Sequence, residues 1–70
     1  MKKDNIAIIG LGYWGTIVTN TLISMGEFNR IYIYDSDFEK IRIIKKKFKN
    51  KVINTDIMKL RRIEKLKIFF

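Results

Sequence analysis

Short apolar runs alternate along this chain with longer segments in which apolar residues recur at helical spacing. The run at 6–9 is continuous and ends at a glycine, which is typical of a strand buried on both faces of a parallel sheet. The next segment predicts a helix from Trp14 to Met25, with Gly26 as its C-terminal stop. Four apolar residues fall on one face of that helix: Ile17, Val18, Leu22 and Met25.

A second strand and a second helix follow. Residues 30–35 are rich in β-branched and aromatic side chains, so they predict the strand. Ser36 and Glu39 have the spacing of a capping box, so we expect the second helix to begin at Ser36. The expected apolar stripe of that helix consists of Phe38, Ile41, Ile44 and Phe48.

The last third of the chain repeats the pattern in shorter pieces. We expect a strand at 52–53, a helix that begins near Thr55 or Asp56, and a fourth strand at 66–70. The order β-α-β-α-β-α-β predicts the fold class α/β, a partial Rossmann fold of about four parallel strands with three crossover helices. The chain ends within its fourth apolar run. We therefore expect residues 1–70 to be the N-terminal portion of one such domain, cut short, with no second domain present.

The composition excludes several kinds of chemistry. The chain has 70 residues, no cysteine and no histidine, so it lacks the usual ligands of zinc, haem and iron–sulfur clusters. The histidine bases of common hydrolases are absent too, and we expect neither a metal site nor a catalytic residue. The lack of cysteine fits a cytoplasmic protein, and no apolar run reaches the roughly 18 residues of a membrane span.

The motif that carries chemistry is Gly10-x-Gly12-x-x-Gly15, which follows the first strand and opens the first helix. Gly10 allows a sharp turn, Gly12 lets the backbone approach a pyrophosphate, and Gly15 allows the helix to pack closely on the sheet. The helix N-terminus offers free N–H donors, and we expect the amides of Tyr13 and Trp14 to meet the phosphate. Large aromatic side chains at a helix start more commonly pack than contact a ligand, so we expect the two rings to pack.

Asp35 ends the second strand about 20 positions after the last glycine, which is the spacing of a dinucleotide-binding βαβ unit. Its carboxylate would accept hydrogen bonds from an adenosine ribose, and its charge would repel a 2′-phosphate. The sequence therefore predicts NAD rather than NADP as the cofactor, a preference that Lys40 and Arg42 would soften. The alternative is a glycine-rich turn that binds nothing, with Asp35 as an ordinary carboxylate at a strand end.

The segment 6–15, with Tyr13 and Trp14 between the second and third glycines, resembles the opening of the Gfo/Idh/MocA family of NAD(P)-dependent oxidoreductases. Residues 35–40 resemble the family's stretch after the second strand, which implies that Lys40 contacts the cofactor near the adenine. The resemblance implies hydride transfer between a nicotinamide cofactor and a sugar- or polyol-like substrate. The family's catalytic lysine and substrate domain have no counterpart in this sequence. A small-molecule substrate is therefore expected only for a full-length form.

Two other functions stay open. The net charge of +8, from 15 Lys and Arg against 7 Asp and Glu, allows a small basic module that binds nucleic acid. The basic residues cluster at 45–51 and 61–67, but no motif that reads DNA or RNA accompanies them. We therefore favour the interpretation that they form a solvated surface. The other alternative is a truncated product without independent activity. The sequence carries no indication of an oligomeric state.

Overall fold

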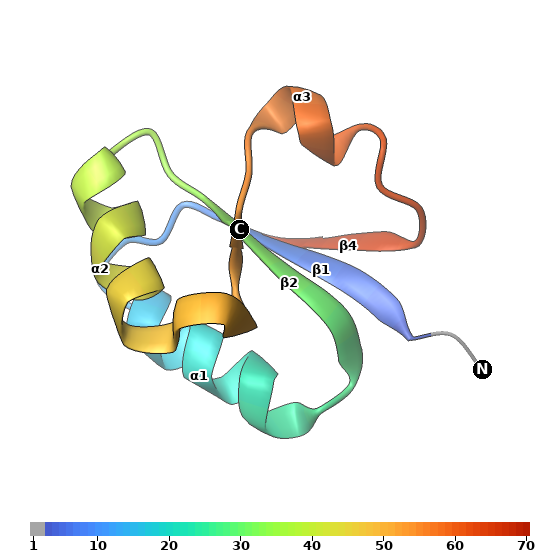
Figure 1. The fold of residues 1–70 in the computed structure, drawn as a ribbon, viewed down its shortest axis with the longest axis horizontal. Helices are drawn as coiled ribbons and strands as arrows, with labels where there is room; N and C mark the ends of the chain where they lie inside the picture. The colour runs from blue at the N-terminus through green and yellow to red at the C-terminus, as the bar shows by residue number, and fades with distance from the viewer. Residues whose placement is uncertain (1–2) are drawn as a thin grey trace.

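In the computed structural model, which describes residues 3–70, four parallel strands form one sheet in the order β3-β2-β1-β4 (Figure 1). The strands are β1 (Asp4–Ile9), β2 (Phe28–Tyr34), β3 (Ile53–Asn54) and β4 (Leu66–Phe69). They are joined by α1 (Gly15–Met25), by α2 (Phe38–Phe48) with the 3-10 turn η1 (Lys49–Lys51), and by α3 (Ile57–Leu60). The predicted fold class is confirmed.

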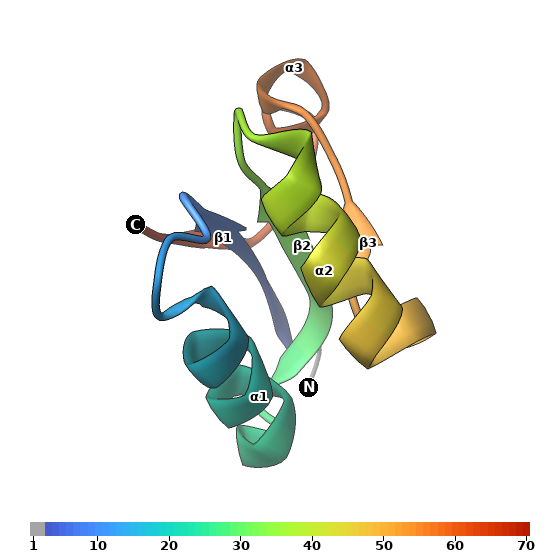
Figure 2. The ribbon, with the colours of Figure 1, turned by 90° about the vertical axis from the view of Figure 1, so that its left-hand side faces the viewer.

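The helices cover the two faces of the sheet unequally. Figure 1 shows α1 and α2 on one face and the single turn of α3 on the other, and Figure 2 looks onto α1 and α2 in front of the sheet. Alternate residues of β1 point to opposite faces, so Ile6 and Ile8 join the core under α1 and α2, whereas Ala7 joins the cluster under α3. The larger core contains ten buried residues: Ile6, Ile8, Leu11, Leu22, Ile31, Ile33, Ile41, Ile44, Phe48 and Val52.

Strand β1 occupies the position that matters for ligand binding. Ile8 is paired with Ile33 of β2 on one side and with Phe69 of β4 on the other. The first crossover runs from β1 to β2, whereas β4 lies on the opposite side of β1, so the strand order reverses between β1 and β4. Ligands of open α/β sheets bind in the crevice beyond the carboxyl ends of the strands at such a switch point.

Helix α1 differs from its predicted form. It begins at Gly15, one residue after the expected start at Trp14, and Ile17 and Met25 are about half exposed. The expected apolar face is therefore wrong for those two residues. The buried residues of α1 are Gly15, Thr19 and Leu22. The helix approaches Leu11 closely, and this close approach favours small residues on the inward side near its start.

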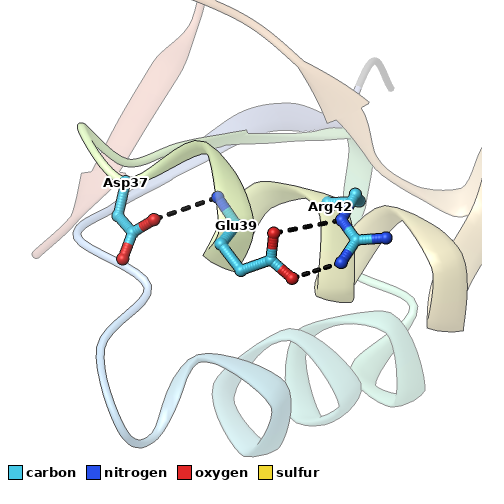
Figure 3. Close-up of polar contacts among 3 residues, drawn as sticks. All are labelled: Asp37, Glu39 and Arg42. Atoms are coloured by element: carbon cyan, nitrogen blue, oxygen red, sulfur yellow. Dashed lines mark hydrogen bonds and ion pairs between the residues drawn. The ribbon is translucent and has the colours of Figure 1, made fainter.

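Helix α2 is capped by Asp37 and not by Ser36. The Asp37 side chain accepts the backbone N–H of Glu39 at 3.0 Å, and the helix begins at Phe38 (Figure 3). Because Phe38 lies in the first turn, beyond the edge of the core, it is exposed and does not extend the apolar stripe as predicted. The other three members of the stripe are buried: Ile41, Ile44 and Phe48.

The last third of the chain follows the prediction with small shifts. Strand β3 lies one residue later than expected, and α3 begins after Asp56, whose side chain accepts the N–H of Lys59 at 2.8 Å. Helix α3 is a single turn, and Leu60 from it is buried against Ala7 and Tyr32. The second face of the sheet therefore has a small core of its own.

Candidate functional site

The glycine loop connects the carboxyl end of β1 to the start of α1. Gly10 and Gly12 both have left-handed backbone conformations, with φ of 82° and 41°, which other residues adopt only with strain. A Cβ atom built on either glycine would meet nothing within 4 Å, so the space above both residues is open. The N–H of Gly10 donates to the carbonyl of Tyr34 at 3.0 Å, which fixes the beginning of the loop to β2.

Leu11 holds the middle of the loop in place. Its side chain is only 2% exposed and belongs to the main core, although the glycines on either side of it face open space. A Cβ atom on Gly15 would come within 3.0 Å of the Leu11 Cβ, so this third glycine is required for the approach of α1 to the loop. The tight contact therefore joins α1 to the loop, whereas we expected it to join α1 to the sheet.

Asp35 is hydrogen-bonded directly to the backbone of the glycine loop. One carboxylate oxygen accepts the N–H of Leu11 at 2.7 Å, and the other accepts the N–H of Asp37 at 2.8 Å. The hydrogen bond from Asp37 lowers the pKa of this carboxyl most; burial opposes the shift, and the N–H groups of Leu11 and Gly12 and the charge of Lys40 reinforce it. Asp35 is therefore ionised at neutral pH. The hydrogen bonds from Leu11 and Asp37 occupy one lone-pair position on each oxygen, so the carboxylate retains further acceptor capacity.

Among the described residues, two hollows border the glycine loop and a third borders Asp35. The switch-point hollow, of about 370 Å³, is bordered by Ile8, Gly10, Leu11, Gly12, Tyr13, Trp14, Gly15, Val18, Phe69 and Phe70. The carboxylate hollow, also about 370 Å³, is bordered by Tyr34, Asp35, Ser36, Phe38, Ile41, Asn54, Thr55, Asp56 and Lys59. The helix-pair hollow, about 480 Å³, is bordered by Leu11, Gly12, Tyr13, Thr16, Lys40, Ile43 and Ile44.

The residues predicted to bind a cofactor are divided among these hollows. All five from the glycine loop border the switch-point hollow: Gly10, Gly12, Tyr13, Trp14 and Gly15. Asp35 borders the carboxylate hollow and reaches the loop through its hydrogen bond to Leu11. Lys40 borders the helix-pair hollow, together with Gly12 and Tyr13. The glycine loop is therefore the element at which all the predicted residues converge.

The aromatic pair in the loop does not pack into the protein. The side chain of Tyr13 is 90% exposed and that of Trp14 is 62% exposed, so the expectation that these rings pack is wrong. The two rings contact each other edge to face, with centroids 5.4 Å apart and planes at 80°. The N-cap residue of α1 is Trp14, and no side chain caps the helix. The first turn contains no acidic residue.

Arg42 is already paired. Its guanidinium forms two hydrogen bonds with the carboxylate of Glu39, one turn earlier on α2 (Figure 3). This pairing lowers the pKa of Glu39 and raises that of Arg42. The arginine that we expected to soften a preference for NAD is therefore occupied by an intrahelical ion pair.

Sequence reasoning missed the polar residues at the end of β3 and directly after it. Asn54, Thr55 and Asp56 border the carboxylate hollow, but we considered Thr55 and Asp56 only as a helix start. Their place after a strand was the available signal, because the carboxyl ends of parallel strands meet at one edge of the sheet. The role of Leu11 was also missed, since no sequence motif indicates that a side chain within a glycine loop is buried.

Comparison with known proteins decides the family. Residues 5–70, which are nearly the whole chain, match the family described as PglD N-terminal domain. The chain belongs to the PglD N-terminal domain family. Searches of curated proteins and of solved structures found no match. PglD N-terminal domains are Rossmann-like nucleotide-binding domains, so the prediction of a nucleotide-binding domain is confirmed, and the roles of the individual glycine-loop residues stay a prediction.

The PglD match corrects the expected membership of the Gfo/Idh/MocA family and the oxidoreductase activity that it implied. The features behind that expectation were a buried strand, three spaced glycines and an acidic residue after the second strand. These are physical requirements of any βαβ unit that holds a diphosphate, so they do not discriminate between families that share it. The Tyr13–Trp14 pair, which was part of the resemblance, is not sufficient to assign a family.

Residues 3–70 lack two other features that would point to a function. No group of three or more Asp and Glu side chains in this part of the chain is arranged to hold a metal ion. Within the same residues, no helix has the length and apolar character needed to cross a membrane.

Proposed function

We propose that this domain binds a nucleoside diphosphate group at the glycine loop, as the nucleotide-binding part of a sugar N-acetyltransferase. The observation that carries the proposal is the open space above Gly10 and Gly12, next to a helix start without an acidic residue. A diphosphate there would meet free backbone N–H groups and the positive end of the α1 dipole. In this proposal the amides of Tyr13 and Trp14 are donors to it.

The nucleoside would extend into the carboxylate hollow. Asp35 retains acceptor capacity for ribose hydroxyls even though Leu11 and Asp37 occupy one position on each oxygen. Asn54 and Thr55 add polar groups to the same hollow. Lys40 borders the helix-pair hollow together with Gly12 and Tyr13, and its positive charge there would offset phosphate charge.

A nucleotide-linked sugar is the ligand that we favour. Transfer of an acetyl group to a sugar amine moves no hydride, so it needs no nicotinamide cofactor. A nucleotide-binding domain in such an enzyme is most simply explained if the nucleotide is attached to the sugar. NAD is the second candidate, and it is supported by the Gly10–Gly15 pattern with Asp35 at the end of β2.

Calorimetry with the full chain tests the proposal. UDP, UDP-glucose and NAD are titrated separately into the wild type and into Gly12→Ala and Gly26→Ala variants. Both glycines have positive φ and open space at the Cβ position, so the two variants share their backbone strain. Only Gly12 borders the proposed site, and we expect only Gly12→Ala to weaken ligand binding.

Two calorimetric results would contradict the proposal or change its ligand. If the chain melts cooperatively but binds none of the three ligands, the proposed function is wrong. Binding of NAD with no binding of UDP or UDP-glucose would instead select the second candidate.

A further inference from the structure

The switch-point hollow carries one feature that the proposed diphosphate site does not use, namely its aromatic wall. Tyr13 and Trp14 border it from the glycine loop, and Phe69 and Phe70 border it from the end of β4. No charged side chain is among the residues that border it. The side-chain wall of the hollow, away from the backbone N–H groups of the loop, is therefore suited to a neutral ring.

The exposure of the aromatic pair lacks a folding explanation. Burial of an aromatic side chain stabilises a folded chain, yet Tyr13 and Trp14 remain 90% and 62% exposed. Their edge-to-face contact fixes the rings relative to each other at 5.4 Å. The two rings therefore form an ordered, solvent-exposed apolar surface directly beside the glycine loop.

The position of the loop determines what the aromatic surface would meet. A diphosphate on the loop has two ends, and the polar carboxylate hollow on the β2–β3 side fits the nucleoside. The other end then points to the β4 side, where the switch-point hollow lies. Its volume of about 370 Å³ is large enough for one six-membered ring with its substituents.

We infer that Trp14, supported by Tyr13, is a specificity-determining residue that stacks against the pyranose ring carried by the second phosphate. This inference rests on the proposed function. The C–H groups on one face of a pyranose pack against the electron-rich face of an indole ring. The hydroxyl groups on the ring's edge remain free for water or for other parts of the enzyme.

The chain contains a single tryptophan, so its fluorescence reports on Trp14 alone. UDP-glucose and UDP share the base, the ribose and the diphosphate and differ by the pyranose. We expect UDP-glucose to shift the Trp14 emission to shorter wavelength and to protect it from iodide quenching, and UDP to do so much less. Equal effects of the two ligands would overturn the ring contact.

Substitution of Trp14 distinguishes its contact with the pyranose ring from the binding of the diphosphate. In calorimetry, Trp14→Ala should weaken UDP-glucose binding about five- to tenfold while the affinity for UDP stays unchanged. Trp14→Phe should retain part of the difference. Met58→Ala is the control, because Met58 is an exposed apolar residue on α3 that borders none of the three hollows.

The other outcomes of these binding measurements each contradict a specific part of the inference or of the proposed function. An unchanged affinity of Trp14→Ala for UDP-glucose overturns the inference and leaves the diphosphate site intact. An equal loss for UDP and UDP-glucose shows that Trp14 acts on the loop, which also overturns it. If the ring effect is seen only when NAD is compared with ADP, the hollow holds a nicotinamide ring and not a pyranose, which overturns the inference. Failure of wild-type chain to bind UDP would be a failure of the proposed function itself.

Discussion

The Oδ2 atom of Asp35 accepts the backbone N–H of Leu11 at 2.7 Å, across 24 positions of the chain. This hydrogen bond joins the end of β2 to the middle of the glycine loop. Because β1 and β2 are paired side by side, Ile9 lies opposite Tyr34, and the two following segments meet without a long connection. The site is therefore held together by the same strand pairing that forms the sheet.

Replacement of Asp35 should destabilise the domain even without a ligand. Asp35→Ala leaves the buried N–H of Leu11 and the N–H of Asp37 without their acceptor. We expect the free energy of unfolding to fall by about 1–3 kcal/mol, measured by urea denaturation. Asp4→Ala is the matched control. Asp4 forms only a partly exposed ion pair with Lys67 at 3.6 Å, and its loss should cost about 0–1 kcal/mol. Equal losses in both variants would contradict the structural role of Asp35.

The stability of the domain should fall in acid, and Asp35 should account for part of the loss. The pKa of its carboxyl is lower in the folded chain than the ordinary value of 3.8, so the ionised form is favoured by folding. This contribution is fully present above the ordinary pKa and is lost as the pH falls through the lower, folded value. Urea midpoints between pH 7 and pH 2.5 measure it. Asp35→Asn should lower the urea midpoint at pH 7, and its midpoint should then fall less steeply with acid than that of the wild type. If the midpoint of Asp35→Asn falls as steeply as that of the wild type, Asp35 does not account for the acid sensitivity.

The cap of α2 should matter more than the ion pair on its surface. Asp37→Ala removes the acceptor for the N–H of Glu39 and should cost about 1 kcal/mol in the free energy of unfolding (Figure 3). Glu39→Gln breaks the pair with Arg42. Because both side chains of this pair are more than half exposed, we expect a smaller loss than for Asp37→Ala. Thermal melts of the two variants give the order. A larger loss for Glu39→Gln would show that the surface pair, and not the cap, determines the start of the helix.

Gly15→Ala should destabilise the domain, although alanine normally favours a helix over glycine. The new methyl group would lie 3.0 Å from the Leu11 Cβ, which is itself buried in the core. Overpacking of this kind costs about 1–3 kcal/mol, which exceeds the gain of up to about 1 kcal/mol in helix propensity. Asn20→Ala, on the exposed side of α1, is the control and should be neutral or slightly stabilising. A stabilised Gly15→Ala variant would mean that α1 can move away from Leu11 at little cost.

The elements of this fold were accessible from the sequence because local patterns determine them. The Ile6–Ile9 run and the helical spacing around Ile41 and Ile44 predict a buried strand and a half-buried helix, as found. The faces of α1 were predicted less well, since its inward side is selected by the close approach to Leu11 and not by apolar character. Ile17 is exposed and Thr19 is buried, the reverse of what their apolar character predicts.

The candidate site was predictable only in part, for a similar reason. The glycine spacing and Asp35 identified the loop and its neighbouring carboxylate, which are chemical requirements at fixed distances along the chain. The hydrogen bond from Leu11 and the polar residues after β3 depend on which strand ends meet in space. The family was predicted incorrectly because the same loop physics serves enzymes with different reactions.

Leu11 combines a side chain fixed in the core with a backbone N–H held by Asp35, while open space lies over the glycines on both sides. The loop is consequently preorganised: its conformational entropy is lost when the domain folds and not when a ligand arrives. Association should then proceed without an ordering step, so the bimolecular rate constant should be limited by encounter and orientation. Mutations that loosen Leu11 would transfer that entropic cost to the binding reaction and weaken affinity without touching any atom of the ligand.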